Sequence, residues 1–234
     1  MTQSLRTRTI ITFLFTAALT LSAKPQTPAP NTTEWENEAL KLRLFYPSDL
    51  MKADTEQVMQ DGHLALFGIS GASDPKLAEA THCLRPVLLL ELPQSGGSPP
   101  PAPTATILLA ELDINCLTTE QQKATTLLND MAEIVNKVPG MKSNAQPATY
   151  TIGWQKVHMA AAQGQPQGQP QTPNSSPSQL YTMGLSTNWN SHLLVWYLSS
   201  SSVDTLNRIT KTTVRFGRDQ AAPLYPLTIG NATP

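Results

Sequence analysis

Leucine occupies every second position near the start of the chain, at Leu40, Leu42 and Leu44, and Pro47 follows shortly afterwards. Side chains two residues apart point to the same face of a β-strand, and proline interrupts the hydrogen bonds of a strand. The pattern predicts a first strand that begins near Leu40, buries one face and ends at Pro47.

Two continuous apolar runs come next, Val87–Leu90 and Ile107–Ala110. They lie within the segments 83–92 and 106–117, and the connection 93–105 is rich in proline, glycine and serine. This order predicts an antiparallel hairpin with a long flexible loop. Because both faces of such strands are apolar, the sheet must be covered on both sides. We therefore expect helices above and below one sheet.

The second half of the chain predicts a meander of four further strands. These strands cover 149–152, 155–161, 180–187 and 192–199. The connection 163–179 contains only glycine, glutamine, proline, serine, threonine and asparagine. Because this composition cannot supply a core, we expect a disordered hairpin loop there.

Helix-start signals precede four segments. Asp54 and Thr118 are each followed three residues later by glutamine, Asp74 is followed directly by proline, and Ser201 is followed three residues later by Asp204. Such pairs are typical of helix N-termini. The helices predicted from these signals span 55–69, 75–80, 118–138 and 201–213. Together with the strands they predict an α+β fold, in which a central antiparallel sheet has helices on both faces (an α/β/α sandwich).

The first residues of the chain have the features of a cleavable signal peptide. Arg6 and Arg8 precede an apolar block, Ile10–Leu21, and small residues follow up to Ala23. The block is shorter than the roughly 20 residues that a membrane-spanning helix requires, and an uncleaved anchor is the weaker alternative. We therefore expect an exported, periplasmic or extracellular protein with no membrane span in the mature chain.

Composition divides the chain into parts. We expect a signal peptide, a flexible lead-in, a single domain with loops near 93–105 and 163–179, and a C-terminal tail, at 1–23, 24–34, 35–217 and 218–234. The whole chain contains 40% apolar residues, and after removal of the signal peptide it can bury one sizeable core.

Charge excludes one class of partner. Removal of residues 1–23 takes away two arginines and no acid, so the net charge changes from −1 to −3. A chain with this charge has no basic field to attract phosphates. We do not expect nucleic acid as a partner.

The order of the elements resembles the PsbP-like family, named after the extrinsic protein of the photosynthetic oxygen-evolving complex and including secreted bacterial proteins of unknown role. The resemblance covers roughly 40–216, through Leu44–Pro47, the glycine turn at Ile152–Gly153, the strand Leu193–Leu198 and the closing Val214–Phe216. It implies a central antiparallel sheet with helices on both faces and a binding or accessory role. The two polar loops and the cysteine pair depart from the family, and no site residue carries over.

Cys83 and Cys116 are the only cysteines, and export would place them in an oxidising compartment. In a hairpin centred on 97–101 they face each other, which predicts a cross-strand disulfide. Two free buried thiols are the alternative. His82 next to Cys83 could suggest a catalytic thiol, but sequence neighbours on a strand point to opposite faces.

Other chemistry-bearing side chains lack the spacings of known sites. Ser70 lacks the glycine of a nucleophile elbow, and Glu111 and Asp113 on one strand do not oppose each other as paired carboxylates do. No metal-ligand spacing links the four histidines, which are His63, His82, His158 and His192. We expect no catalytic residue, no metal and no cofactor.

Trp154 and Trp189 fall in predicted turns. A large ring in a turn either packs beneath the loop or is offered to a partner. Both are therefore candidate partner contacts.

These features favour a non-enzymatic exported protein that binds a partner protein or a small ligand in the cell envelope or outside it. A secreted hydrolase whose site assembles only in three dimensions is one alternative, and a structural envelope component is the other. The pattern identifies neither the ligand nor the oligomeric state.

Overall fold

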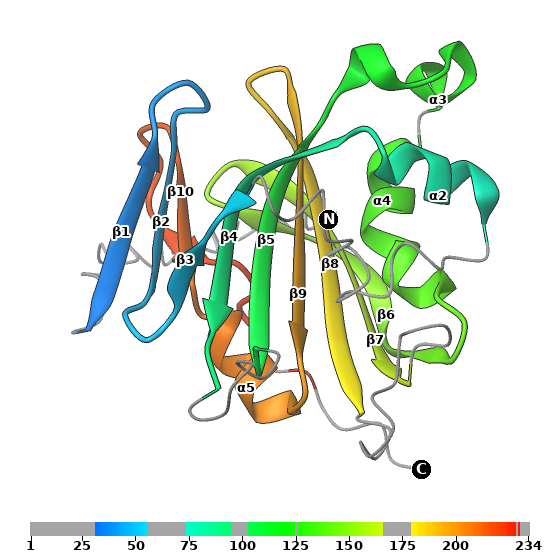
Figure 1. Cartoon of the computed structure of the whole chain (residues 1–234). Helices are drawn as coiled ribbons and strands as arrows, with labels where there is room; N and C mark the ends of the chain where they lie inside the picture. The colour runs from blue at the N-terminus through cyan, green and yellow to red at the C-terminus, as the bar shows by residue number, and fades with distance from the viewer. Residues whose placement is uncertain are drawn as a thin grey trace, which may run out of the picture.

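The computed structural model of the chain describes residues 31–55, 74–94, 103–124, 126–165, 179–227 and 229. The expected signal peptide lies outside these residues, as do most of the helix expected over 55–69 and most of both expected loops. The described residues form two antiparallel sheets and several short helices (Figure 1).

Seven strands of the described ranges form the main sheet, in the order β3-β4-β5-β9-β8-β7-β6. Their bounds are Met51–Ala53 (β3), Leu84–Leu92 (β4), Ala105–Leu112 (β5), Met141–Ile152 (β6), Gln155–Gly164 (β7), Leu180–Trp189 (β8) and His192–Ser200 (β9). The predicted hairpin and the predicted meander are both confirmed. Pairing of β5 with β9 joins them, so that Ala110 lies opposite Val195.

Four more strands in the described part of the chain form a smaller sheet, in the order β1-β2-β10-β11. Their bounds are Thr32–Asn37 (β1), Leu42–Pro47 (β2), Thr213–Phe216 (β10) and Ala222–Pro223 (β11). The alternating burial along β2 confirms the first predicted strand. Because β1 begins at Thr32, strand structure starts inside the segment 24–34 that was expected to be a flexible lead-in.

The helices are short. Their bounds are Pro75–Thr81 (α2), Ile114–Cys116 (η3, a 3-10 turn), Thr119–Lys123 (α3), Leu127–Glu133 (α4), Ile134–Lys137 (η4, a 3-10 turn) and Val203–Ile209 (α5). The starts of α2 and α3 agree with the predicted caps, whereas α5 is capped by Ser202, one residue later than expected, and Thr213 belongs to β10. No helix within the described ranges combines the length and the hydropathy needed to cross a bilayer.

The single helix predicted over 118–138 is wrong. Ala124 has an extended backbone, with φ −69° and ψ 111°, and this separates α3 from α4. None of the residues in α3 is buried, whereas α4 and η4 bury Leu127, Met131 and Val135, which lie four positions apart as one face of a helix requires. The break lets α3 turn towards α2, where the Gln121 side chain donates a hydrogen bond to the Lys76 carbonyl at 3.0 Å.

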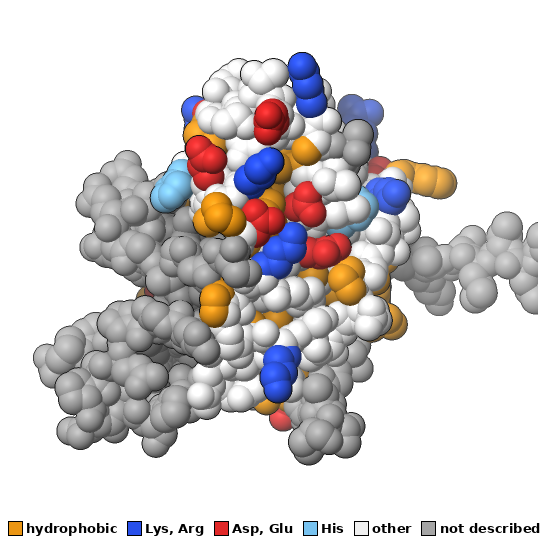
Figure 2. Space-filling view, turned by 90° about the vertical axis from the view of Figure 1, so that its right-hand side faces the viewer, with side chains coloured by type: hydrophobic (Ala, Val, Ile, Leu, Met, Phe, Trp, Pro, Cys, Tyr) orange, Lys and Arg blue, Asp and Glu red, His pale blue; other side chains and the backbone are white. Residues whose placement is uncertain are grey.

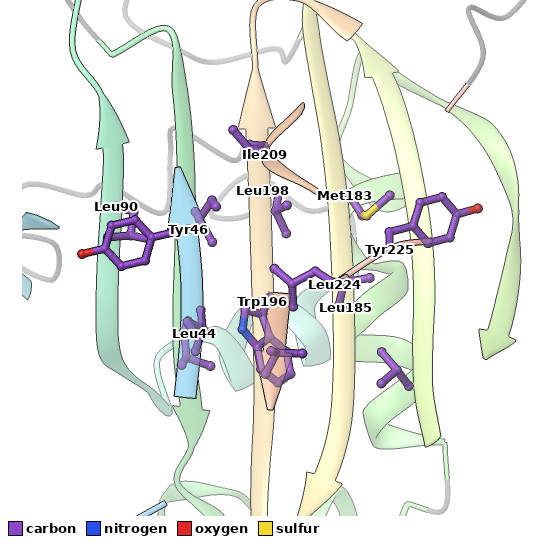
Figure 3. Close-up of a cluster of buried hydrophobic side chains, with 14 of the residues drawn as sticks. Leu44, Tyr46, Leu90, Met183, Leu185, Trp196, Leu198, Ile209, Leu224 and Tyr225 are labelled. Carbon is purple, nitrogen blue, oxygen red and sulfur yellow. The ribbon is translucent and has the colours of Figure 1, made fainter. Parts of the chain in front are cut away.

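The main sheet buries side chains on both faces. Successive residues of one strand belong to different core clusters, so that Leu88 faces one cluster and Leu89 the other. Figure 3 shows the cluster on the small-sheet side, where Leu44 of β2 lies near Trp196 of β9 and Leu224 of the C-terminal segment. The second cluster lies beneath α2 and α4.

The two faces of the main sheet are covered differently. Helices α2 and α4 and the turn η4 pack on one face, while the small sheet covers the other with α5 beside it (Figure 1). The α+β class is therefore confirmed, but a helical layer on each face is not. The reason is that β2 and β10 turn Leu42, Leu44, Val214 and Phe216 towards the main sheet and do most of the covering.

The C-terminal segment is part of the fold. Leu224, Tyr225 and Ile229 are buried in the cluster beneath the small sheet. The backbone N–H of Leu224 donates to the Thr212 carbonyl at 2.8 Å, and the Tyr150 hydroxyl donates to the Leu224 carbonyl. The expected tail 218–234 is thus corrected, since packed residues continue to Ile229.

Candidate ligand-binding groove

A groove of about 530 Å³ opens on the helical face of the molecule, between α2, α3 and α4. We call it the helical groove; it is lined by Asp74, Lys76, Leu77, Glu79, Ala80, Thr118, Thr119, Glu120, Gln121, Ala124, Leu127, Asp130 and Lys137. Figure 2 shows this side of the molecule, where acidic, basic and hydrophobic side chains are intermixed. Its volume lies within the roughly 300 to 1,000 Å³ that is usual for ligand pockets.

Local capping builds two walls of the helical groove. In α2, the Asp74 carboxylate accepts the backbone N–H groups of Lys76 and Leu77 at 3.0 and 3.4 Å. In α3, Thr118 Oγ1 accepts the N–H of Gln121 at 3.3 Å, and Gln121 Oε1 accepts the N–H of Thr118 at 2.9 Å. These bonds satisfy N–H groups that the first turn of a helix leaves without partners.

The floor of the helical groove is apolar. Leu77, Ala80 and Leu127 are buried, and Leu77 and Leu127 belong to the core cluster beneath the helices. Ala124 is exposed at the end of α3. Leu77 and Leu127 are only 6% and 8% exposed, so the apolar contact that they offer a ligand is small and is extended by exposed Ala124.

Ion pairs link the walls. Lys76 Nζ lies 3.7 Å from Glu120 Oε2, which joins α2 to α3. Lys137 Nζ lies 3.8 Å from Asp74 Oδ2, which joins η4 to the start of α2. Both lysines of the groove therefore already have an acidic partner.

Two further acids face the helical groove without such a partner. In the described part of the chain, no lysine or arginine lies within 4.0 Å of the carboxylates of Glu79 and Asp130. Asp130 Oδ2 accepts a hydrogen bond from Thr126 Oγ1 at 2.7 Å. The walls thus carry an excess of negative charge above an apolar floor.

The sequence pattern does not mark this site. It identifies Asp74 and Thr118 only as caps, and it does not point to Glu79 or Asp130. The segments 74–80 and 118–137 meet through tertiary packing, and no spacing along the chain reports that contact.

The predicted pair Cys83 and Cys116 is disulfide-bonded, with the Cα atoms 5.4 Å apart. The bond does not link two strands as expected, because Cys116 lies in η3, beyond the end of β5. Cys83 is buried and follows the residue that ends α2, while Cys116 is exposed and lies two residues before the cap of α3 at Thr118. The disulfide therefore ties together α2 and α3, two of the three helices that wall the helical groove.

The two tryptophans lie in different environments. Trp154, in the tight turn between β6 and β7, is 91% exposed. Trp189 is half-buried at the end of β8; its ring centroid lies 5.2 Å from that of Phe216, and its Nε1 donates to the Leu40 carbonyl at 2.7 Å. Packing accounts for Trp189, whereas Trp154 stays a candidate partner contact. Neither lines the helical groove.

The remaining candidate side chains do not form a common site. Glu111 Oε1 lies 2.6 Å from His192 Nδ1, and Asp113 pairs with Arg85 instead. His82 caps the C-terminus of α2 and is exposed. The described residues contain no group of three or more histidine, cysteine or acidic side chains placed to hold a metal ion. His63 and Ser70 lie outside the described residues.

His158 lies beside a small cavity of about 150 Å³ that Glu133 and Thr149 also line. Its Nδ1 is 3.0 Å from Thr149 Oγ1. Burial lowers the pKa of His158, and the charge of Lys156 lowers it further, while Glu133 opposes them. The lowered pKa favours the neutral imidazole.

No family model and no curated protein sequence matches the chain. One solved structure that aligns with it is cyanobacterial PsbP (CyanoP) from Synechocystis sp. PCC 6803, at 9% identity and a TM-score of 0.42, over 84% of this chain and 98% of that one. Another is PA94, a protein of unknown function from Pseudomonas aeruginosa, at 13% identity and a TM-score of 0.34, over 74% of this chain and 85% of that one. At TM-scores below 0.5 neither likeness establishes a fold family or a function, and PsbP-like membership stays a prediction.

Proposed function

We propose that this chain is a non-enzymatic, exported binding protein that holds a segment of a partner protein in the helical groove. The observation that supports this function is the combination of an apolar floor, at Leu77 and Leu127, with charged walls from three helices. Ligand sites commonly have this composition, because apolar contact supplies affinity and a few polar groups supply orientation. The signal-like N-terminus and the disulfide support export.

Site-specific photo-cross-linking tests this proposal in the source organism. A photoreactive phenylalanine analogue replaces Ala124, which lines the helical groove and is exposed. The matched control places the same analogue at Ala39, which is also exposed but lies between β1 and β2. Illumination of the exported protein is expected to give a discrete adduct with another protein from position 124 and none from position 39.

Two results would contradict the proposal. One is the same adducts from both positions, which would mean nonspecific contact. The other is no protein adduct from position 124 while the substituted chain is exported and folded, as near-ultraviolet circular dichroism would show. Either result would remove the helical groove as the binding site.

A further inference from the structure

We infer that the segment held in the helical groove is both cationic and apolar, with a lysine or arginine next to leucine-like side chains. The inference rests on the proposed function and names the chemistry of the partner. It follows from the carboxylates on the walls, from the apolar floor between them, and from the pairing of the protein's own lysines with other acids.

The walls present carboxylates that the protein's own cations do not neutralise. Lys76 and Lys137 are paired with other acids, which leaves Glu79 and Asp130 without a cationic partner within the described ranges. The undescribed segments after residue 55 contain no lysine or arginine at all. Among the described residues, a ligand cation would therefore meet two acids that lack a competing partner.

The positions of these acids suit a long basic side chain. Glu79 belongs to α2 and Asp130 to α4, so they approach from different walls, and Leu77 and Leu127 form the floor between the same two helices. Lysine and arginine lay their methylene groups on apolar surface and keep the charged end in a polar setting. A charged end beside a carboxylate forms a charge-assisted hydrogen bond, which is stronger than a neutral one.

A peptide suits this site better than a small polyamine. A polyamine offers charge but no bulky apolar group for the floor, whereas an amphipathic segment offers both. Recognition of an amphipathic segment by a groove between helices depends on apolar anchors spaced along one face of the segment. Exposed Ala124 leaves space for such an anchor at the end of α3.

Fluorescence anisotropy with defined probes tests the inference. The first probe is a labelled amphipathic peptide of leucine, alanine and lysine; the second has every lysine replaced by glutamine. The full exported chain is expected to bind the lysine peptide at least tenfold more tightly. Excess spermine serves as a competitor that carries charge without apolar groups.

Two pairs of substitutions separate a groove effect from a general charge effect. Glu79→Gln with Asp130→Asn removes two charges from the walls, and Glu38→Gln with Asp204→Asn removes two exposed charges elsewhere. We expect the groove pair to weaken binding of the lysine peptide by about two- to fivefold per carboxylate. The groove pair should also reduce the dependence of the affinity on salt concentration. The control pair should leave the affinity and its salt dependence almost unchanged. Equal melting temperatures would show that both variants fold.

The outcomes are distinguishable from those of the cross-linking experiment. Equal affinity for the two peptides, or equal weakening by the two variant pairs, would overturn the cationic ligand even if position 124 gives an adduct. Displacement of the peptide by spermine at the peptide's own affinity would overturn the peptide assignment. Failure of the wild type to bind the lysine peptide would also refute the inference, while the proposed function is judged by cross-linking alone.

Discussion

Gly184 of β8 lies directly beneath the backbone of α4. A Cβ atom at this position would stand 2.1 Å from the Ala132 carbonyl oxygen, far inside contact distance. Nearby, the Tyr197 hydroxyl donates to the Met131 carbonyl at 2.8 Å. Single residues on the sheet therefore decide how closely α4 can pack and how its carbonyl groups are satisfied.

Gly184→Ala is expected to destabilise the protein strongly. The added methyl group must push α4 away from the sheet, because the atom that it meets belongs to the backbone, and we expect a loss of roughly 3 kcal/mol in the free energy of unfolding. Gly153→Ala is the comparison, because its φ of 59° costs an alanine about 1 to 2 kcal/mol and its Cβ would meet a side chain, that of Asp219 at 3.0 Å, rather than backbone. Urea denaturation measures both. Equal losses would refute the close contact.

His158 predicts a dependence of stability on pH. Because burial lowers its folded pKa below the unfolded value of about 6.5, the unfolded state takes up the proton first as the pH falls. Above the unfolded pKa, the neutral ring contributes its full share of stability. This share is lost as the pH falls from the unfolded pKa to the folded pKa. The wild type should therefore lose more stability than His158→Gln between about pH 7 and 5. Parallel curves from urea denaturation would contradict this.

At the scale of elements, few contacts other than the disulfide hold α3 in place. It buries no residue, and its links to α2 are the hydrogen bond from Gln121 to the Lys76 carbonyl and one exposed ion pair. Exposed ion pairs contribute little to stability. The Cys83–Cys116 bond, next to both helices, is therefore the main covalent constraint on the shape of the helical groove.

Removal of the disulfide should loosen this region and lower stability. Cys83→Ala with Cys116→Ser avoids a buried hydroxyl, and we expect a loss of about 2 to 4 kcal/mol, which lowers the melting temperature by roughly 5 to 15 °C. Hydrogen exchange should accelerate most in 114–123, while β8 and β9 keep their protection at a temperature where the variant is folded. Uniform acceleration over the whole chain would contradict a local role.

At the scale of the whole molecule, the C-terminal segment closes the core between the two sheets. Leu224 is 1% exposed and packs in the cluster that contains Leu44 and Trp196 (Figure 3). Leu227, three residues later, is 63% exposed. The segment therefore stabilises the contact between the sheets through particular residues rather than along its whole length.

A pair of leucine substitutions tests the role of this segment. Leu224→Ala leaves a cavity in the core and is expected to cost about 2 to 5 kcal/mol, whereas Leu227→Ala should cost less than about 0.5 kcal/mol. Thermal unfolding followed by circular dichroism compares the two. Similar melting temperatures would mean that the segment adds nothing to the stability of the core.

Strong local signals predicted much of this fold. The leucines of β2 and the apolar runs of β4 and β5 identified strands, because burial on one or both faces leaves a direct pattern in the sequence. Asp74 and Thr118 identified helix starts, because capping is a contact between near neighbours. The two cysteines, with the hairpin between them, predicted the disulfide.

Only the tertiary structure decided how these pieces meet. The apolar residues Ala124, Leu127 and Met131 repeat at helical spacing and favoured one continuous helix, but α3 has no core to face and turns towards α2 instead. The small sheet and Leu224 cover a face for which the pattern predicted helices. The reason is that an apolar strand face indicates that some element covers it, but it does not identify that element. Glu79 and Asp130 share one groove although 51 positions separate them. The sequence by itself thus determined the local elements, whereas packing between distant segments decided the layers and the site.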